Sequence, residues 1–163
     1  MAKVTGTSCS TFLVDPQERI LLQYRDEKAR LFPNCWSVFT ERFQESDREG
    51  AGLGPIAPYR ACATRGIGEE LKVQTAGGLE SFVPQERLFH FFKGSYEDDT
   101  QAVDQYAFTG ELYVPLERLV AAEGKRVDVF SLDQVRTMHI AANYGQFIEI
   151  LYEKLGRGEL ADR

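Results

Sequence analysis

The chain has 163 residues, enough for one domain whose hydrophobic core needs neither disulfides nor a structural metal. Its 43% hydrophobic and 27% charged residues are typical of a globular protein, and no apolar run is long enough to span a bilayer. The formal net charge of −6 disfavours a nucleic-acid partner, because non-specific binding to the phosphate backbone depends on lysine and arginine. We expect a single domain over residues 1–163, without a nucleic-acid or membrane partner.

The three cysteines bear on the compartment. Cys9, Cys35 and Cys62 are odd in number and widely spaced, without a Cys-x-x-Cys pattern, which argues against a disulfide framework and against a zinc site. Residues 1–6 carry one positive charge and no apolar core, so no secretory signal is expected. The reducing cytoplasm fits these features best.

Two β-rich runs at the start of the chain predict a hairpin. Residues 7–14 and 19–24 are apolar, and a short segment with an Asp-Pro turn lies between them. An alternation of large apolar residues then predicts another strand over residues 36–39. Residues 45–56 contain three glycines and a proline among acidic residues, so they predict a surface loop.

A long helix is predicted over residues 58–71. Pro58 suits the first turn of a helix, because its missing N–H would have no partner there. Apolar residues follow at fourfold spacing and form a stripe for packing on a sheet, at Ala63, Ile67 and Leu71. Gly66 and Gly68 lie inside this helix, and each costs about 1 kcal/mol relative to alanine at an exposed interior position.

Further β-rich runs follow this helix. They lie at residues 79–83, 87–93 and 106–114. An acidic segment at residues 95–100 divides the last two runs and is expected to be a loop. Residues 126–130 return to a strand pattern. These runs add strands to a central sheet.

The remaining patterns predict helices. Residues 115–123 are expected to form a short helix that stops at Gly124. Ser131 and Gln134 have the spacing of a capping box, so another helix should begin near Leu132. From residue 141 onward, apolar residues recur at helical spacing until Gly156. The expected fold class is α/β of the α+β type, with a mixed β-sheet sandwiched between α-helices.

The first long helix ends in a motif, RGIGEELKV at residues 65–73. This motif resembles the second half of the Nudix box, usually written G-x5-E-x7-R-E-U-x-E-E-x-G-U with U an aliphatic residue. The matching residues are Arg65, Ile67, Glu69, Glu70 and Val73. The departures are Gly66 and Ala57, which replace glutamates, and Lys72, which replaces a glycine.

Two other segments carry the same resemblance. Residues 36–44 resemble the strand that enters the box, with Phe-Thr-Glu at residues 39–41 in place of the Pro-Gly-Gly that the family often has. Residues 123–133, EGKRVDVFSLD, resemble the Glu-Gly and Phe-Ser-Leu segment before a late helix in many Nudix proteins. The resemblance covers residues 9–155 and implies the Nudix fold.

The Nudix resemblance also implies a metal site on the helix. Positions 66, 69 and 70 are three and four residues apart, so their side chains project from one helical face. Mg2+ commonly takes one or two carboxylates together with phosphate oxygens and water, so Glu69 and Glu70 are expected to bind Mg2+ or Mn2+. The cation would lower the pKa of a bound water that attacks phosphorus.

Arg65, Glu69 and Glu70 are accordingly the expected catalytic residues. In the family the box arginine orients a catalytic glutamate, and Arg65 is expected to do the same. An alternative stays open, because Arg65 and Glu69 also make an ordinary i,i+4 ion pair on any solvated helix.

The expected substrate-binding residues are Arg25, Arg42 and Glu123. The two arginines lie near strand ends that face the ligand in related proteins, where a guanidinium binds phosphate through paired hydrogen bonds. Because Gly66 removes one carboxylate, another acidic residue is a candidate for the third metal ligand. The candidates are Glu45, Asp47, Glu49, Glu97, Asp98, Asp99 and Glu123.

The leading functional hypothesis is a magnesium-dependent hydrolase of a nucleoside diphosphate linked to another moiety, with reduced activity and a small-molecule diphosphate substrate. The missing carboxylate at Gly66 favours an alternative, a ligand-binding or regulatory module with the same fold. Isopentenyl-diphosphate isomerase is a third hypothesis, since residues 31–36 resemble its approach to the tryptophan; residues 37–44, however, lack the cysteine and histidine of that family. The identity of the substrate and the presence of a homodimer stay open.

Overall fold

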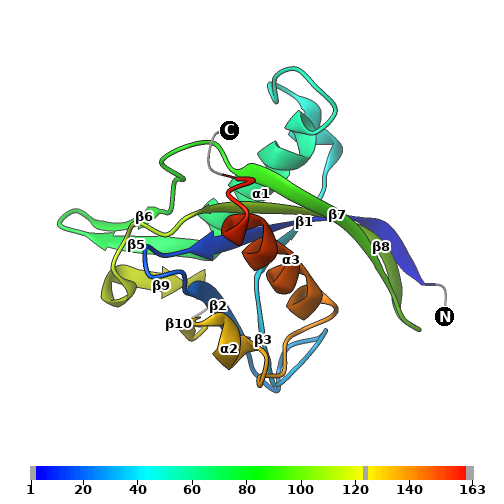
Figure 1. Cartoon of the computed structure of the whole chain (residues 1–163). Helices are drawn as coiled ribbons and strands as arrows, with labels where there is room; N and C mark the ends of the chain where they lie inside the picture. The colour runs from blue at the N-terminus through cyan, green and yellow to red at the C-terminus, as the bar shows by residue number, and fades with distance from the viewer. Residues whose placement is uncertain (1–2, 123–124, 161–163) are drawn as a thin grey trace.

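The computed structural model describes residues 3–122 and 125–160, and a mixed sheet is its main feature (Figure 1). Within these residues the sheet has seven strands in the order β10-β2-β1-β8-β7, with β3 beside β2 and β4 beside β1. The strands are β1 (Val4–Val14), β2 (Ile20–Arg25), β3 (Cys35–Ser37), β4 (Phe39–Arg42), β7 (Phe89–Glu97), β8 (Gln101–Glu111) and β10 (Val127–Phe130).

β1 is the central strand of this sheet. It pairs with β8 in parallel along its whole length, and with β2 and β4 in the antiparallel sense. Its successive residues Phe12 and Leu13 are both fully buried but belong to different core clusters, so both faces of the sheet are covered. A strand covered on both faces is apolar without alternation, as the last three residues of β1, Phe12 to Val14, are. The predicted N-terminal hairpin is confirmed.

A second sheet follows α1 (Ala57–Glu70). Within the described residues it has three strands in the order β6-β5-β9, with β5 at Leu71–Thr75, β6 at Gly78–Ser81 and β9 at Leu119–Ala121. The predicted helix is confirmed and ends one residue early, but β5 was not predicted. Leu71 fits both the fourfold helical stripe and the strand alternation in which Leu71 and Val73 are buried.

The prediction of a helix over residues 115–123 is wrong for residues 115–122, the part of this segment that the structure describes. The chain forms one short 3-10 turn, η2 (Leu116–Arg118), and then enters β9. In β9 the side chains of Leu119 and Ala121 are buried and that of Val120 is exposed, which is the period of a strand. The pairing of β9 with β5 decides the local structure, and that pairing joins segments far apart in the sequence.

The prediction of an acidic loop at residues 95–100 is also wrong. β7 and β8 extend into this segment and form a hairpin. The carboxylate of Asp98 closes the turn: its Oδ1 accepts hydrogen bonds from the backbone N–H groups of Thr100 and Gln101, at 2.7 and 3.0 Å. A short aspartate side chain can replace a backbone acceptor in this way. The hairpin therefore projects well beyond the layers of helices (Figure 1).

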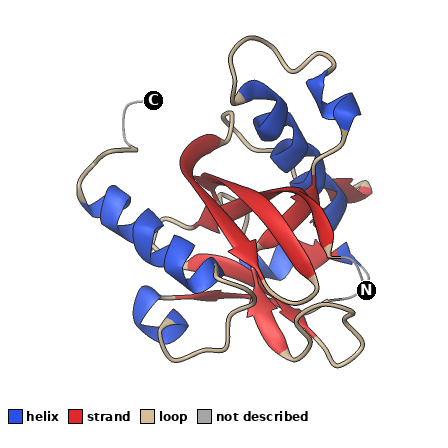
Figure 2. Cartoon of the chain, turned by 90° about the vertical axis from the view of Figure 1, so that its right-hand side faces the viewer, coloured by secondary structure: helices blue, strands red, loops and turns tan. Residues whose placement is uncertain are grey.

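The helices cover the two faces of the main sheet. Figure 2 shows α1 and α3 (Tyr144–Gly156) on opposite sides of the strands. α2 (Leu132–Val135) begins where the capping box predicts, with Ser131 Oγ accepting from the N–H of Gln134. The predicted mixed sheet between helices is thus confirmed. No helix in residues 3–122 and 125–160 is long and apolar enough to cross a membrane.

The α3 face of the sheet depends on an aromatic cluster. Phe147 of α3 is 2% exposed, and its ring stacks on that of Phe12 with a centroid distance of 6.2 Å. The ring of Phe92 meets it edge-on at 5.2 Å. Such rings account for much of the apolar surface that a helix buries on a sheet.

Phe147→Ala is expected to lower the free energy of unfolding by about 3–5 kcal/mol, because it leaves a cavity between α3 and β1. Urea denaturation followed by circular dichroism measures the change. Glu153→Ala, an exposed position on the same helix, is the control and should change the free energy by less than about 0.5 kcal/mol. Equal midpoints for the two variants would show that Phe147 does not anchor α3.

Candidate active site

Arg65 extends from α1 toward the loop that precedes the helix. Its Nε donates to Asp47 Oδ1 at 2.9 Å and its Nη2 donates to Asp47 Oδ2 at 3.0 Å, which makes a bidentate pair. Nη2 also donates to the carbonyl oxygen of Arg42 at 3.1 Å. Arg65 therefore joins α1 to the 3-10 turn η1 (Glu45–Arg48) and to the end of β4.

Asp47 is the buried member of this pair. Its side chain is 5% exposed, and the N–H of Gln44 donates to its Oδ2 at 2.8 Å. The hydrogen bonds from Arg65 hold the pKa of Asp47 below its usual value, in spite of burial, which acts to raise it. Because the folded-state pKa lies below the unfolded value of about 3.9, the pair stabilises the fold above that pH. This contribution is lost as the pH falls through the lowered pKa.

The other terminal nitrogen of Arg65 faces two glutamates. Nη1 lies 3.6 Å from Glu41 Oε1 and 3.7 Å from Glu69 Oε1. Glu69 is one turn further along α1, whereas Glu41 reaches the same place from β4. These four side chains, Arg65, Asp47, Glu41 and Glu69, form what we name the Arg65 cluster.

Glu41 is the more buried of the two glutamates, with 19% of its side chain exposed against 58% for Glu69. The N–H of Arg42 donates to Glu41 Oε1 at 2.9 Å and fixes the carboxylate. Burial raises the pKa of Glu41 and the neighbouring Glu69 raises it further, although the Arg42 N–H and the Arg65 charge act in the opposite direction. A carboxylate in such surroundings is stabilised by a nearby cation.

Glu41 and Glu69 supply two carboxylate donors to this cluster. Two carboxylates are the usual protein share for Mg2+ when phosphate oxygens and water complete the octahedron. Among residues 3–122 and 125–160, no group of three or more His, Cys, Asp or Glu side chains could hold a metal ion.

Gly66 lies directly against Glu41. A Cβ atom added to Gly66 would lie 2.4 Å from Glu41 Cβ and 3.0 Å from Glu41 Cγ, whereas real Cβ atoms essentially never come closer than 3.0 Å to such neighbours. The space that a side chain at position 66 would need is filled by Glu41. A glutamate placed at position 66 has no room while Glu41 is present, so that substitution alone does not restore the family's arrangement.

The structure brings only some of the predicted site residues together. Arg65 and Glu69 meet, and their i,i+4 ion pair is formed, but the strongest contact of Arg65 is with Asp47. Glu70 is partly exposed at the last residue of α1 and does not share the contact with Arg65. Glu123 lies outside the described residues.

Asp47, one of the candidates for the third metal ligand, is instead bound to Arg65. Glu41, which lies beside Arg65, is not one of the candidates that the sequence analysis names. The signal for Glu41 is in the sequence: a glutamate stands where the family often has glycine, and Gly66 stands where the family has glutamate. Neither departure says by itself that the two positions touch.

Arg25 and Arg42 line two neighbouring cavities on the α3 face of the sheet. Arg25 lines a cavity of about 190 Å³, and Arg42 lines one of about 550 Å³. Both cavities share the residues Ser8, Leu31, Thr40, Gln101 and Val103. The Nη2 of Arg25 donates to the carbonyl oxygen of Leu31 at 2.7 Å, so Arg25 holds the loop that closes the smaller cavity.

Two buried polar atoms in the smaller cavity have no partner among the described residues. They are Ser8 Oγ and Gln105 Oε1, on residues that face each other across β1 and β8. Asn143 Nδ2 donates to the carbonyl oxygen of Ser95, so Asn143 Oδ1 accepts from Gln105 Nε2 at 2.8 Å. These two hydrogen bonds fix the orientation of the Gln105 amide and leave Oε1 as a buried acceptor without a partner among the described residues.

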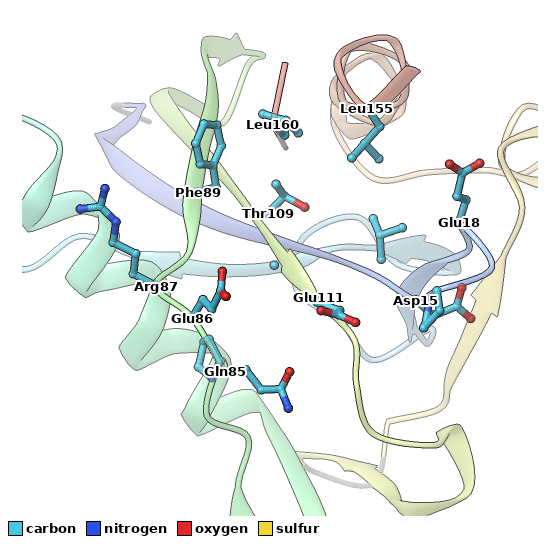
Figure 3. A pocket seen from close by; sticks show the side chains of 14 residues that line it. Asp15, Glu18, Gln85, Glu86, Arg87, Phe89, Thr109, Glu111, Leu155 and Leu160 are labelled. Atoms are coloured by element: carbon cyan, nitrogen blue, oxygen red, sulfur yellow. The ribbon is translucent and has the colours of Figure 1, made fainter. Parts of the chain in front are cut away.

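A separate cavity of about 480 Å³ lies at the far ends of β1 and β8 (Figure 3). Its acidic lining residues are Asp15, Glu18, Glu86 and Glu111. The carboxylate of Asp15 already accepts a hydrogen bond from Arg19 Nε at 2.8 Å. No member of the Arg65 cluster lines this cavity, so it is not part of the candidate active site.

Solved structures with this fold include three informative cases. A MutT protein from Methanosarcina mazei Go1 is 16% identical, with 98% of each chain covered and a TM-score of 0.64. The NUDIX domain of Shewanella oneidensis NrtR, complexed with ADP ribose, is 15% identical, with 95% of this chain and 90% of that chain covered and a TM-score of 0.68. A NUDIX hydrolase from Alicyclobacillus acidocaldarius is 12% identical, with 91% of each chain covered and a TM-score of 0.68.

Sequence comparison alone does not reach these proteins, since no family model and no curated protein sequence matches the chain. The similarity lies in the path of the backbone, which is followed over nearly the whole chain. Together with the order of strands and helices, it shows that this chain has the Nudix fold.

Proposed function

We propose that this protein is a magnesium-dependent hydrolase of a small molecule in which a nucleoside diphosphate is linked to another moiety. The observation that carries the proposal is the Arg65 cluster, in which Glu69 on α1 and Glu41 on β4 lie at one terminal nitrogen of Arg65. This cluster and the cavities that contain Arg25 and Arg42 meet at β4.

Glu69 and Glu70 would hold Mg2+ or Mn2+ at the end of α1. When bound, the cation would neutralise the negative charge of the diphosphate and lower the pKa of an attacking water. The part of Arg65 is to position Glu69, and Asp47 keeps the guanidinium fixed through its bidentate pair. A fixed guanidinium loses little entropy when it orients a neighbouring carboxylate.

The course of β4 supports a path from the cavities to the cluster. Thr40 and Arg42 line the larger cavity, whereas Glu41 between them contacts α1, because successive strand residues point to opposite faces. Within the described residues β4 pairs only with β1, so its outer edge is free of other strands. If the nucleobase of a ligand lies in the larger cavity, the diphosphate of that ligand would extend across this edge to the Arg65 cluster. Arg42 is exposed at the same edge.

The smaller cavity supports a ligand group that donates a hydrogen bond. Gln105 Oε1 is an acceptor without a partner among the described residues, and Ser8 Oγ lies on the residue opposite. An unpaired buried acceptor costs free energy that a ligand N–H group would recover. Leu31, Phe32 and Tyr144 supply an apolar wall for a flat ring.

A second candidate function is ligand binding without efficient turnover. Gly66 in place of a box glutamate favours it, as does the ADP ribose bound by the similar NrtR domain. The isomerase alternative has no such support: residues 37–44 contain neither cysteine nor histidine, and Cys35 is buried with its Sγ donating to the carbonyl oxygen of Phe32.

Glu69→Gln and Glu70→Gln should each lower Mg2+-dependent turnover by about 100-fold or more, since each removes a charged oxygen ligand. The measurement is the release of nucleoside monophosphate, followed by chromatography, from a panel of nucleotide sugars, dinucleotides and nucleoside triphosphates. Glu80→Gln, at an exposed position of β6, is the control and should retain wild-type turnover. Unchanged turnover in the first two variants would reject the hydrolase, and tight nucleotide binding by wild type without turnover would favour the second candidate.

Gln105→Leu should raise KM for the best substrate of that panel by about fivefold, because one buried hydrogen bond is worth about 1 kcal/mol. The turnover number should change little, since Gln105 lies on the α3 face, away from the Arg65 cluster. The matched control is Gln146→Leu, at an exposed position of α3. An unaltered KM in Gln105→Leu would remove the cavity from the substrate site.

A further inference from the structure

Two departures from the Nudix box lie against each other in the fold. Glu41 stands at the last position of the segment where the family often has Pro-Gly-Gly, and Gly66 stands where the family has glutamate. A Cβ atom on residue 66 would come within 2.4 Å of Glu41 Cβ. Where the family has a small residue on the strand and a large one on the helix, this chain has the reverse.

Nothing in the backbone requires glycine at position 66. Gly66 lies in the interior of α1, and it is absent from the glycines with positive φ. An alanine in a helix interior is more favourable than glycine by about 1 kcal/mol. The observed reason for glycine here is the space taken by Glu41.

The carboxylate of Glu41 occupies the region that a side chain at position 66 would enter. Its Oε2 lies 3.6 Å from the position of a Cβ on residue 66, while its Oε1 is fixed by the N–H of Arg42. Its Oε1 and the Oε1 of Glu69 lie at nearly equal distances from Nη1 of Arg65. Glu41 therefore places a carboxylate beside Glu69 from the strand instead of from the helix.

The charges of the Arg65 cluster leave two carboxylates for a cation. Arg65 is the one positive member and makes its bidentate pair with Asp47. Glu41 and Glu69 share only the longer contacts at Nη1, of 3.6 and 3.7 Å. These long contacts with one charge of Arg65 offset only part of the repulsion between the two carboxylates, and a divalent cation would offset the rest.

We propose that Glu41 is a ligand of the divalent cation and replaces the carboxylate that position 66 lacks. This inference rests on the proposed function, because it assumes that the cation binds at the end of α1. It adds that glutamate and glycine have exchanged places across the contact of β4 with α1. The carboxylate that the family has on the helix is then supplied by the strand.

The test is a set of four proteins: wild type, Glu41→Gly, Gly66→Glu and the double variant that carries both changes. The readout is Mn2+ affinity by electron paramagnetic resonance, without any substrate. We expect Glu41→Gly to weaken Mn2+ binding at least ~10-fold. The double variant should recover most of that loss, because the helix then supplies the carboxylate into the vacated space.

Gly66→Glu alone should lower the melting temperature, because its side chain collides with Glu41. Glu41→Gln keeps the packing of Glu41 and removes its charge, so it reports on the ligand role if Glu41→Gly folds poorly. Glu80→Gly, at an exposed position of β6, is the matched control and should bind Mn2+ like wild type.

The outcomes separate this inference from the proposed function. If Glu69→Gln weakens Mn2+ binding but Glu41→Gly and Glu41→Gln do not, the role of Glu41 is overturned and the hydrolase proposal stands. If wild type does not bind Mn2+, the metal-dependent hydrolase proposal itself fails. A folded double variant that binds no better than Glu41→Gly would overturn the exchange of places.

Discussion

The bidentate pair of Arg65 with Asp47 is the interaction on which the candidate site depends. It joins a helix, a 3-10 turn and the end of a strand at one guanidinium. Asp47 is almost fully buried, so the removal of Arg65 would leave a poorly solvated carboxylate. Because the pair occupies two nitrogens of Arg65, only Nη1 is left for Glu41 and Glu69, and this fixes where the two glutamates meet.

The central sheet gives this site its second constraint. The two faces of β1 are covered by different helices, and the cavities lie on the α3 face while the Arg65 cluster lies on the α1 face. Among the described strands, β4 alone contributes residues both to the cavities and to the Arg65 cluster. The alternation of Thr40, Glu41 and Arg42 along this short strand places neighbouring residues of one segment in different environments.

The sequence predicts most of the architecture, because long periodic segments carry enough information to identify helices and strands. β9 escapes prediction because its pairing partner β5 is distant in the sequence, and pairing overrides local composition. The extended end of the β7–β8 hairpin escapes prediction because its acidic composition is typical of a loop, whereas β8 pairs there with the distant strand β1 as well as with β7. Leu71 shows a different failure, since one residue satisfies two periodicities at a helix-to-strand boundary.

The candidate site is predicted in part for similar reasons. Arg65 and Glu69 follow from helical spacing, which is a local property. Glu41 does not, because its importance arises from contact with a residue 25 positions away that only the fold brings near. Gln105 and Ser8 are likewise ordinary polar residues until the parallel register of β1 and β8 places them opposite each other.

The tight contact at Gly66 has a consequence for how such a chain can diverge. Two large side chains at positions 41 and 66 would collide, and two small ones would leave the contact without a carboxylate. Each position therefore sets which substitutions the other tolerates, and one-step mutational routes between the two arrangements pass through a crowded or a vacant intermediate. A motif search that scores each sequence position independently counts both substitutions of such a pair as mismatches.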